Sequence, residues 1–527
     1  MIRVQIALVY VFAAAALVSQ SLDPVKLQEP PTDTWPTYNG DYSGRRFSTL
    51  SKINTHNVDS LSLAWLYRID AGGDKLGGSI KSTPILVGGV LYFTIPDHVW
   101  AVDARTGREV WHYVWKSRGG VHLGNRGVGV YGNWLYFETP DCNLVSLDLK
   151  DGKERWHKQI CDLDQYYYAS VAPIVIKNRV LVGVSGDDLD IPGYLESRDP
   201  ETGDLQWRWY TVPQKKGDSG SESWPNEDAM KHGGGMTWVP STYDPELNMI
   251  YVGTGNPQPV IAGSARPGSN LFTESIVALN ADTGKMGWFF QCSPHDTHDW
   301  DAVQTPVLFD GEIDGKPRKL LAQASRNGYF FVLDRTTGQN LITSQFVKTN
   351  WAKGVDSKGT PIPDTAKQPQ KDGALVSPDQ AGAVNWPPPS FSPQTGLLYV
   401  NATRAFSEYY IFDPDAKPEG WGGNDRGGWG ESMLQAIDYK TGKVRWSHKW
   451  EGSGIRCGVL STAGNLVFTG DPSNNLVALN AETGQPLWHA NLGNALSNGP
   501  MTYELDGTQY LTVGAGDTLF SFAMLSK

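Results

Sequence analysis

Asp103-Ala-Arg-Thr-Gly107-Arg-Glu-Val-Trp111 is the stretch that decides the fold, because the chain repeats its spacing. In each copy a Gly follows an Asp or Asn by four positions, and a Trp follows that Gly by four more. The complete copies are residues 103–111, 148–156, 199–207, 280–288, 438–446 and 480–488. Residues 334–342 carry Ile342 in place of Trp, and residues 57–65 carry Leu61 in place of Gly. Eight units at this spacing indicate a repeat architecture.

Each unit consists of short apolar strands separated by turns. Residues 82–87, 89–94 and 99–103 are typical, with β-branched and aromatic side chains enriched. The Asp-x-x-Thr-Gly segment predicts a hairpin turn, because Asp or Asn caps its own backbone and Gly accepts a positive φ. The Trp then falls on the following strand, where we expect it to pack as a wedge between neighbouring sheets.

Sheets of this kind must stack to bury both faces, which predicts an all-β, eight-bladed β-propeller with tryptophan-docking repeats. We expect residues 518–523 to pair with residues 61–65 and close the ring. An open β-solenoid with the same turns is the alternative. Excursions over residues 210–237, 346–385 and 413–430 are rich in Gly, Pro, Lys and Asp. They predict loops on one rim rather than separate domains.

The N-terminus predicts export. Arg3, an apolar run over residues 6–18 and a small polar stretch ending at Ser21 are typical of a secretory signal peptide over residues 1–21. An uncleaved membrane anchor is the alternative. After cleavage we expect a periplasmic protein with no integral membrane segment, in which residues 22–527 form a single propeller domain.

Charge and cysteine content narrow the function further. The formal net charge of −11 argues against nucleic-acid binding and is compatible with a basic protein partner. Among the four cysteines, Cys142 and Cys161 flank one hairpin-like unit and are expected to form a disulfide in an oxidising compartment. There is no Cys-x-x-Cys-His motif, so the sequence encodes no covalently attached c-type haem.

Polar residues that interrupt the repeat are candidates for a site on the propeller axis. Residues 294–301 hold three carboxylates and two imidazoles. A solvated polar loop, a zinc site built on His295 and His298, and a hard-cation site beside a catalytic carboxylate are all compatible with this cluster. Asn256 and Asp188 also follow predicted strands. These three segments, from consecutive blades, offer oxygen ligands that favour Ca²⁺ or a similar hard ion.

Cationic and aromatic residues also stand at strand ends. Arg126 and Arg326 would suit a polyanionic ligand that bears carboxylates. Trp238 is out of register with the wedge tryptophans, so it is either a further core wedge or a flat platform for an aromatic cofactor. The long loops are expected to line the substrate pocket through residues that include Tyr409, Trp421 and Trp429.

Over residues 35–523 these motifs resemble the quinoprotein alcohol dehydrogenases, the pyrroloquinoline quinone (PQQ) enzymes that include methanol dehydrogenase. The resemblance rests on Asn125-Arg-Gly, Gly234-Gly-Met-Thr-Trp238, Gly253-Thr-Gly-Asn256, Pro294-His-Asp, Arg326-Asn-Gly and Asn385-Trp-Pro-Pro. Non-catalytic outer-membrane assembly propellers share the Trp repeats alone. A propeller scaffold of that kind is therefore the alternative function.

The resemblance implies a role for each matching position. Asp299 would be the catalytic base, and Arg326 would contact the reactive carbonyl of PQQ. The implied metal ligands, for Ca²⁺ or a lanthanide ion, are Asp188, Asn256, Asp299 and Asp301, of which Asp301 is similar to an extra carboxylate of the lanthanide-dependent branch. The implied PQQ contacts are Lys81, Arg126, Ser170, Ser185, Trp238, Arg326 and Asn385.

Three positions depart from the family pattern. Gly120 and Val121 stand about where the family has an adjacent-cysteine disulfide, Lys81 replaces a common Glu, and Asp188 is shorter than the usual Glu. The resemblance still implies a periplasmic PQQ-dependent dehydrogenase. It would oxidise a small alcohol by hydride transfer to metal-bound PQQ and pass electrons to a soluble cytochrome c.

Overall fold

The structure is a computed structural model, and it describes residues 21–71, 78–186, 190–412, 420–452, 454 and 457–524. The expected signal peptide lies outside the described residues, apart from Ser21.

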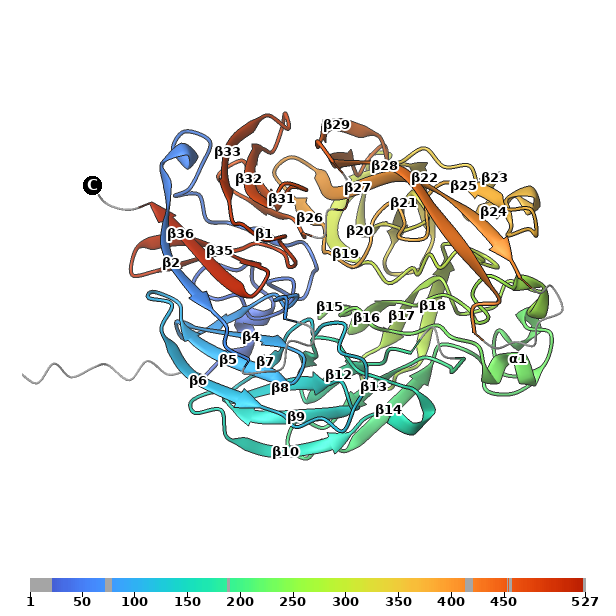
Figure 1. The fold of residues 1–527 in the computed structure, drawn as a ribbon, viewed down its shortest axis with the longest axis horizontal. Coiled ribbons are helices and arrows are strands. Elements are labelled where there is room, and N and C mark those ends of the chain that lie inside the picture. Colours follow the sequence, from blue (N-terminus) through green and yellow to red (C-terminus); the bar gives the residue numbers. More distant parts are fainter. Residues whose placement is uncertain are drawn as a thin grey trace, which may run out of the picture.

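Small antiparallel sheets follow one another along the chain and are arranged in a ring, which makes the fold an all-β propeller (Figure 1). Within the described ranges there are eight sheets of four or five strands. The first sheet in chain order consists of β3 (Ile85–Val87), β4 (Val90–Ile95), β5 (His98–Asp103) and β6 (Glu109–Val114), and the second of β7 (Gly129–Tyr131), β8 (Trp134–Thr139), β9 (Asn143–Asp148) and β10 (Glu154–Gln159). The third consists of β11 (Ile174–Ile176), β12 (Arg179–Gly183), β13 (Tyr194–Arg198) and β14 (Leu205–Tyr210). The fourth consists of β15 (Thr242–Asp244), β16 (Met249–Gly253), β17 (Ser275–Asn280) and β18 (Met286–Gln291).

The remaining sheets complete the ring. The fifth consists of β19 (Val307–Ile313), β20 (Lys316–Ala324), β21 (Tyr329–Asp334) and β22 (Asn340–Gln345), and the sixth of β25 (Ala374–Val376), β26 (Ser390–Ser392), β27 (Leu397–Ile411), β28 (Gly423–Asp438) and β29 (Val444–Lys449). The seventh consists of β1 (Phe47–Ser48), β30 (Leu460–Thr462), β31 (Leu466–Gly470), β32 (Asn475–Asn480) and β33 (Pro486–Asn491). The eighth consists of β34 (Met501–Leu505), β35 (Thr508–Ala515), β36 (Thr518–Met524) and β2 (Leu61–Arg68).

The last sheet joins the two ends of the chain. β2 pairs antiparallel with β36, with Leu61 opposite Met524, Trp65 opposite Ser521 and Arg68 opposite Thr518. The expected pairing of residues 518–523 with residues 61–65 is therefore confirmed. It favours the closed propeller over the open solenoid, because a solenoid would leave both terminal strands unpaired.

The repeated Trp and Gly contact each other across neighbouring sheets. A Cβ added to Gly107 would lie 2.6 Å from the Trp65 ring, and one added to Gly284 would lie 2.5 Å from the Trp207 ring. The same relation holds for Gly152 with Trp111, Gly203 with Trp156, Gly338 with Trp288 and Gly484 with Trp446. The glycine thus serves two purposes: its φ is positive, and its missing side chain lets the preceding blade's indole lie flat on the turn.

Five of the wedge indoles donate a hydrogen bond that fixes them in place. Trp65 Nε1 donates to Ala104 O at 3.0 Å, and Trp288 Nε1 donates to Arg335 O at 3.1 Å. The indoles of Trp111, Trp207 and Trp446 donate to the corresponding carbonyl of the next repeat. Trp156 departs from this pattern, since its buried Nε1 has no partner among the described residues. The wedge interpretation of the repeat is confirmed.

The long excursions are only partly loops. Residues 210–237 carry the single α-helix of the described chain, α1 (Glu227–Lys231), and residues 346–385 carry the small hairpin of β23 (Ala352–Val355) and β24 (Pro361–Pro363). β27 and β28 extend well beyond their sheet as a long hairpin (Figure 1). The expectation of a loop is wrong for residues 423–430, because backbone pairing with β27 holds this glycine-rich segment as strand. Short 3₁₀ turns cover Pro24–Leu27, Val58–Ser60, Leu163–Gln165, Ser221–Ser223, Gly263–Ala265 and Thr365–Lys367.

Two of the four cysteines are paired. Cys142 and Cys161 form the expected disulfide, which links the turn between β8 and β9 to the segment after β10. Cys292 and Cys457 are buried and unpaired.

Candidate functional site

A cavity of about 290 Å³ lies where loops from several sheets meet. Its lining residues are Lys81, Leu123, Gly124, Arg126, Tyr168, Ser170, Ser185, Trp238, Asp299, Asp301, Arg326, Gln380, Asn385, Trp386 and Trp421. Most of them lie at one of two positions in a sheet. Some lie shortly before its first strand, as Arg126 precedes β7 and Trp238 precedes β15, and others lie directly after its second strand, as Arg326 follows β20. The same two positions in successive sheets face one end of the ring, so residues distant in sequence converge there.

Two carboxylates share one buried arginine in this cavity. Arg326 NH1 donates to Asp301 Oδ2 at 2.6 Å, and Arg326 NH2 donates to Asp299 Oδ2 at 3.2 Å. Burial alone would lower the pKa of Arg326, but the nearby carboxylates of Asp299 and Asp301 raise it above its ordinary value. The arginine is therefore a permanent cation, and it fixes the relative position of the two acids.

Asp296 stabilises the loop that carries Asp299. The backbone amides of His298, Asp299 and Trp300 all donate to Asp296 Oδ2, at 3.2, 2.9 and 3.2 Å. Burial would raise the pKa of Asp296, but its interactions with the His298 imidazole and these amides lower it. Asp299 has a positive φ of 66° in this loop, an unusual conformation that the three hydrogen bonds to Asp296 stabilise.

Asn256 presents an oxygen with no partner. Its side chain is fully buried, and Oδ1 accepts no hydrogen bond from any described residue. The backbone N–H of Asn256 donates to Asp301 Oδ1 at 2.8 Å, which brings the amide and the carboxylate together. A buried unpaired carbonyl oxygen is costly unless something binds it, so this atom fits a hard cation.

The other proposed metal ligands give a mixed result. Asp188 lies outside the described residues. Among those the structure describes, no three His, Cys, Asp or Glu side chains are grouped so that they could hold a metal ion. Among the described residues, an ion at this place would find the oxygen of Asn256 and the carboxylates of Asp299 and Asp301, which Arg326 also binds.

Arg126 and its neighbours form another part of the cavity lining. Arg126 NH1 donates to Ser170 Oγ at 2.7 Å, and the hydroxyls of Ser170 and Ser185 are 3.3 Å apart. The guanidinium carbon of Arg126 lies 4.6 Å from the centre of the Trp238 ring. Trp238 is thus a cavity wall and not a core wedge.

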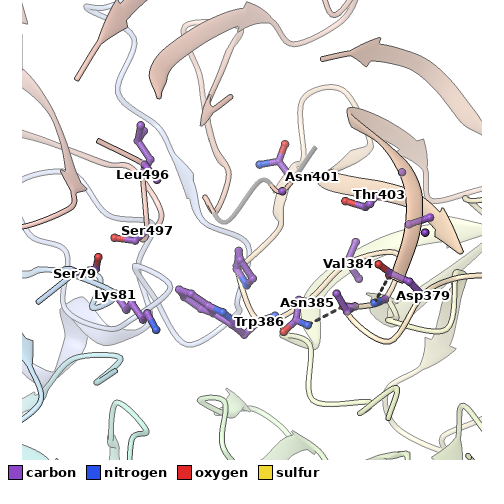
Figure 2. A pocket seen from close by; sticks show the side chains of 18 residues that line it. Ser79, Lys81, Asp379, Val384, Asn385, Trp386, Asn401, Thr403, Leu496 and Ser497 are labelled. Carbon is purple, nitrogen blue, oxygen red and sulfur yellow. Dashed lines mark hydrogen bonds between the residues drawn. The ribbon is translucent and has the colours of Figure 1, made fainter. Parts of the chain in front are cut away.

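Lys81 and Asn385 stand where this cavity meets a second one. Lys81 Nζ donates to Leu123 O, and Asn385 Nδ2 donates to Ala381 O at 2.8 Å. The second cavity measures about 510 Å³ and shares Lys81, Asn385 and Trp386 with the first (Figure 2). Its remaining polar lining includes Asp379, Asn401, Thr403 and Ser497.

The predicted pocket residues are only partly right. Trp421 lines the first cavity, but Tyr409 is fully buried, with its hydroxyl donating to His298 O at 3.3 Å. Trp429 is 62% exposed on β28 and lines neither of the two cavities. These two expectations are wrong, because the β27–β28 hairpin turns alternate side chains to opposite faces.

Sequence reasoning assigned no role to Tyr168, Gln380 or Trp386, all of which line the cavity. Gln380 Nε2 donates to Asp299 Oδ2, the oxygen that Arg326 also binds. The one signal for Trp386 was its position directly after Asn385. Gln380 gave no signal, since only the folded loop brings it to Asp299.

The two imidazoles of the 294–301 segment do not converge on a zinc site. His295 Nδ1 bonds to Gly268 O at 2.8 Å, and burial, followed by the nearby Arg266, lowers the His295 pKa to about 4. His298 stacks on Trp300, with ring centres 4.3 Å apart, and its Nε2 bonds to Lys367 O. Both rings therefore have structural roles.

These residues fit a planar polyanion such as PQQ. Three indoles supply flat apolar surface, Lys81, Arg126 and Arg326 supply positive charge, and Ser170, Ser185 and Asn385 supply neutral polar contacts. No helix within the described ranges is long and apolar enough to cross a membrane.

Comparison with known families identifies two sections of the chain. Residues 35–370 match the model of the glucose/ethanol/alcohol dehydrogenase β-propeller domain, a PQQ family. Residues 430–522 match the model of the outer membrane protein assembly factor BamB. That second section holds two Trp repeats but none of the residues that line the 290 Å³ cavity.

Individual relatives match over nearly the whole chain. The quinoprotein alcohol dehydrogenase PedH of Pseudomonas putida is 36% identical, over 96% of this chain and 89% of its own. The crystal structure of the quinohemoprotein alcohol dehydrogenase from Comamonas testosteroni superposes with a TM-score of 0.88 at 33% identity, covering 97% of this chain and 84% of the other. A europium-containing methanol dehydrogenase gives a TM-score of 0.84 at 29% identity, covering 95% and 99%.

Proposed function

This chain belongs to the quinoprotein alcohol dehydrogenases, and on that premise we propose that it oxidises a small alcohol at the cavity around Asp299. The enzyme class, an oxidoreductase acting on alcohols, follows from the family. The assignment of the reaction to particular residues is our proposal. The observation that carries it is the arrangement of Asp299 and Arg326 in a cavity walled by Trp238. We also take each of the eight sheets as one blade of an eight-bladed propeller.

Asp299 is the proposed general base. Arg326 and Gln380 both donate to its Oδ2, so they hold the carboxylate in one orientation at the cavity surface. A carboxylate in this position accepts the hydroxyl proton of an alcohol while the carbon that bears the hydroxyl is oxidised. When bound, PQQ supplies the two-electron acceptor and the metal ion supplies a Lewis acid.

Arg326 has two roles in this proposal. It neutralises part of the charge of Asp299 and Asp301, and it keeps a guanidinium at the cavity wall where negative charge develops during the reaction. Lys81, Arg126, Ser170, Ser185, Trp238 and Asn385 would bind PQQ. Asn256, with Asp301, Asp299 and Asp188, would hold Ca²⁺ or a lanthanide ion.

We further propose that the protein is exported to the periplasm and passes its electrons to a soluble cytochrome c. The apolar run over residues 6–18 and the Cys142–Cys161 disulfide support export. The net charge of −11 would attract a basic cytochrome and speed its association at low salt.

A non-catalytic scaffold is disfavoured by the same geometry. The match to the assembly-factor model covers the generic repeat at residues 430–522, while the converging charges of the cavity lie outside it. A non-catalytic propeller does not require a buried arginine that binds two carboxylates at a cavity wall.

Asp299→Asn tests the role of the base. The neutral amide keeps the shape of the side chain but cannot accept the proton, so we expect kcat to fall by about 10²–10⁴-fold. PQQ affinity, measured by equilibrium dialysis, should stay within a few-fold of wild type. As a matched control, Asp310→Asn alters an exposed carboxylate that does not line the cavity and should leave kcat unchanged. An Asp299→Asn enzyme that turns over at the wild-type rate would exclude Asp299 as the base.

A further inference from the structure

Arg126 contacts two indole rings at once. Its guanidinium carbon lies 4.6 Å from the centre of the Trp238 ring and 5.4 Å from the centre of the Trp386 ring. The two tryptophans come from different sheets, since Trp238 precedes β15 and Trp386 precedes β26. Both line the 290 Å³ cavity.

We propose that Trp238 and Trp386 form the two walls of a slot for the PQQ ring system, and that Arg126, which lies over both rings, leaves this slot when PQQ binds. The inference rests on the proposed function and adds to it a second aromatic wall and a residue that must move on binding.

The contacts of Arg126 support the slot. Its flat guanidinium lies over both rings, so each indole presents a face to the cavity on which a planar ligand can stack. Arg126 makes cation–π contact with both rings. A polycarboxylate that enters must displace it, and the same guanidinium can then pair with a ligand carboxylate.

The surroundings of both walls allow this exchange. Ser170 Oγ accepts from Arg126 NH1 at 2.7 Å, so the arginine has a polar partner at the edge of the slot. Trp386 also lines the 510 Å³ cavity beside Asn385 and Lys81 (Figure 2). Its ring can therefore adjust to a ligand without disturbing the packed core.

Substitution of the second wall is the first test. Equilibrium dialysis with PQQ and Ca²⁺ would measure Kd for the wild-type protein, Trp386→Ala and Trp386→Phe. We expect at least a tenfold weaker Kd for Trp386→Ala and a change of less than threefold for Trp386→Phe, which restores a stacking face. Trp429→Ala removes an exposed indole outside both cavities and should bind as wild type does. Binding by Trp386→Ala at wild-type strength would overturn the slot.

The position of Arg126 is tested with a neutral form of the ligand. The trimethyl ester of PQQ keeps the ring but carries no carboxylates, so it gains nothing from pairing with arginine. If Arg126 fills the slot, Arg126→Ala should bind PQQ at least tenfold more weakly yet bind the ester more tightly than wild type. Equal or weaker ester binding by Arg126→Ala would overturn the idea that arginine occupies the slot.

These outcomes separate the two proposals. A wild-type protein that binds no PQQ would contradict the proposed function and the slot together. A wild-type protein that binds PQQ, with Trp386→Ala unchanged, would contradict the slot alone.

Discussion

At the scale of single residues, the unusual feature is how many acids surround one arginine. Glu274 is fully buried near Asp296, Asp299 and Asp301, and neither of its carboxyl oxygens accepts a hydrogen bond from a described residue. Burial is the main cause that raises its pKa well above the ordinary value, and the neighbouring acids raise it further. Burial and the neighbouring carboxylates thus favour the protonated, neutral form of Glu274 in the folded protein.

Glu274→Gln should change how stability depends on pH. In the unfolded chain Glu274 ionises above about pH 4.3, while in the folded protein it stays protonated, so wild-type stability falls as pH rises above that value. Glutamine cannot ionise in either state and removes this penalty. We expect the metal-free variant to gain melting temperature relative to wild type at pH 7, and the difference to shrink towards pH 4. A pH-independent difference in calorimetric melting temperature would show that Glu274 is ionised in the folded state.

Asp301→Asn should distinguish metal ions by charge. A trivalent ion gains more from each carboxylate charge than a divalent ion does, and asparagine keeps the shape of Asp301 but removes its charge. We expect Tb³⁺ affinity, followed by luminescence, to fall at least tenfold more than Ca²⁺ affinity. Equal losses for the two ions would contradict a charge-selective role. Melting curves of both metal-free proteins provide the folding control, because Asp301 also accepts the Asn256 amide.

Much of the residue-level site follows from the sequence, but its closest contacts do not. Lys81, Arg126, Trp238, Asp299 and Arg326 could be selected because they interrupt a repeat or match a family motif, and they do line one cavity. Gln380 and Trp386 lie in a loop whose composition carries no periodic signal. Their positions beside Asp299 and Arg126 depend on tertiary packing alone.

At the scale of elements, the turn and wedge of the repeat form one unit of packing. In six of the turns the glycine lies against the indole of the preceding sheet, so neither position can change independently, whereas Gly442 lies against Ile342, which replaces the repeat Trp. Spacing alone predicted that the tryptophans pack as wedges between neighbouring sheets, but not that each wedge lies against a turn glycine. It could not predict the β27–β28 hairpin, since Gly427, Gly428 and Gly430 give a strand no side-chain pattern.

Gly284→Ala, with Gly315→Ala as its control, measures the packing part of this contact. Both glycines have a positive φ, 66° and 71°, but a Cβ at Gly284 would meet the Trp207 ring at 2.5 Å, whereas one at Gly315 meets nothing within 4 Å. We expect Gly315→Ala to cost about 1–2 kcal/mol from backbone strain alone. Gly284→Ala should cost about 1–3 kcal/mol more because the wedge must move. Equal shifts of the urea midpoint in the two variants would contradict the packing role.

At the scale of the whole molecule, the ring places its chemistry at one end. β2 and β36 close the circle, and the segments before successive first strands then converge on a shared cavity. Closure was predictable because strand patterns occur at both chain ends. The volume of the cavity and the presence of a second one beside it were not, since they depend on how loops from different sheets pack together.

The central claim is that this cavity, loaded with PQQ and a metal ion, oxidises alcohols. The direct test is to purify the protein, reconstitute it with PQQ and either Ca²⁺ or a light lanthanide, and measure dye reduction driven by a panel of primary alcohols. We predict turnover that saturates at one PQQ per chain and that requires the metal ion. Tight PQQ binding without turnover, for either metal and across the whole panel, would contradict the account.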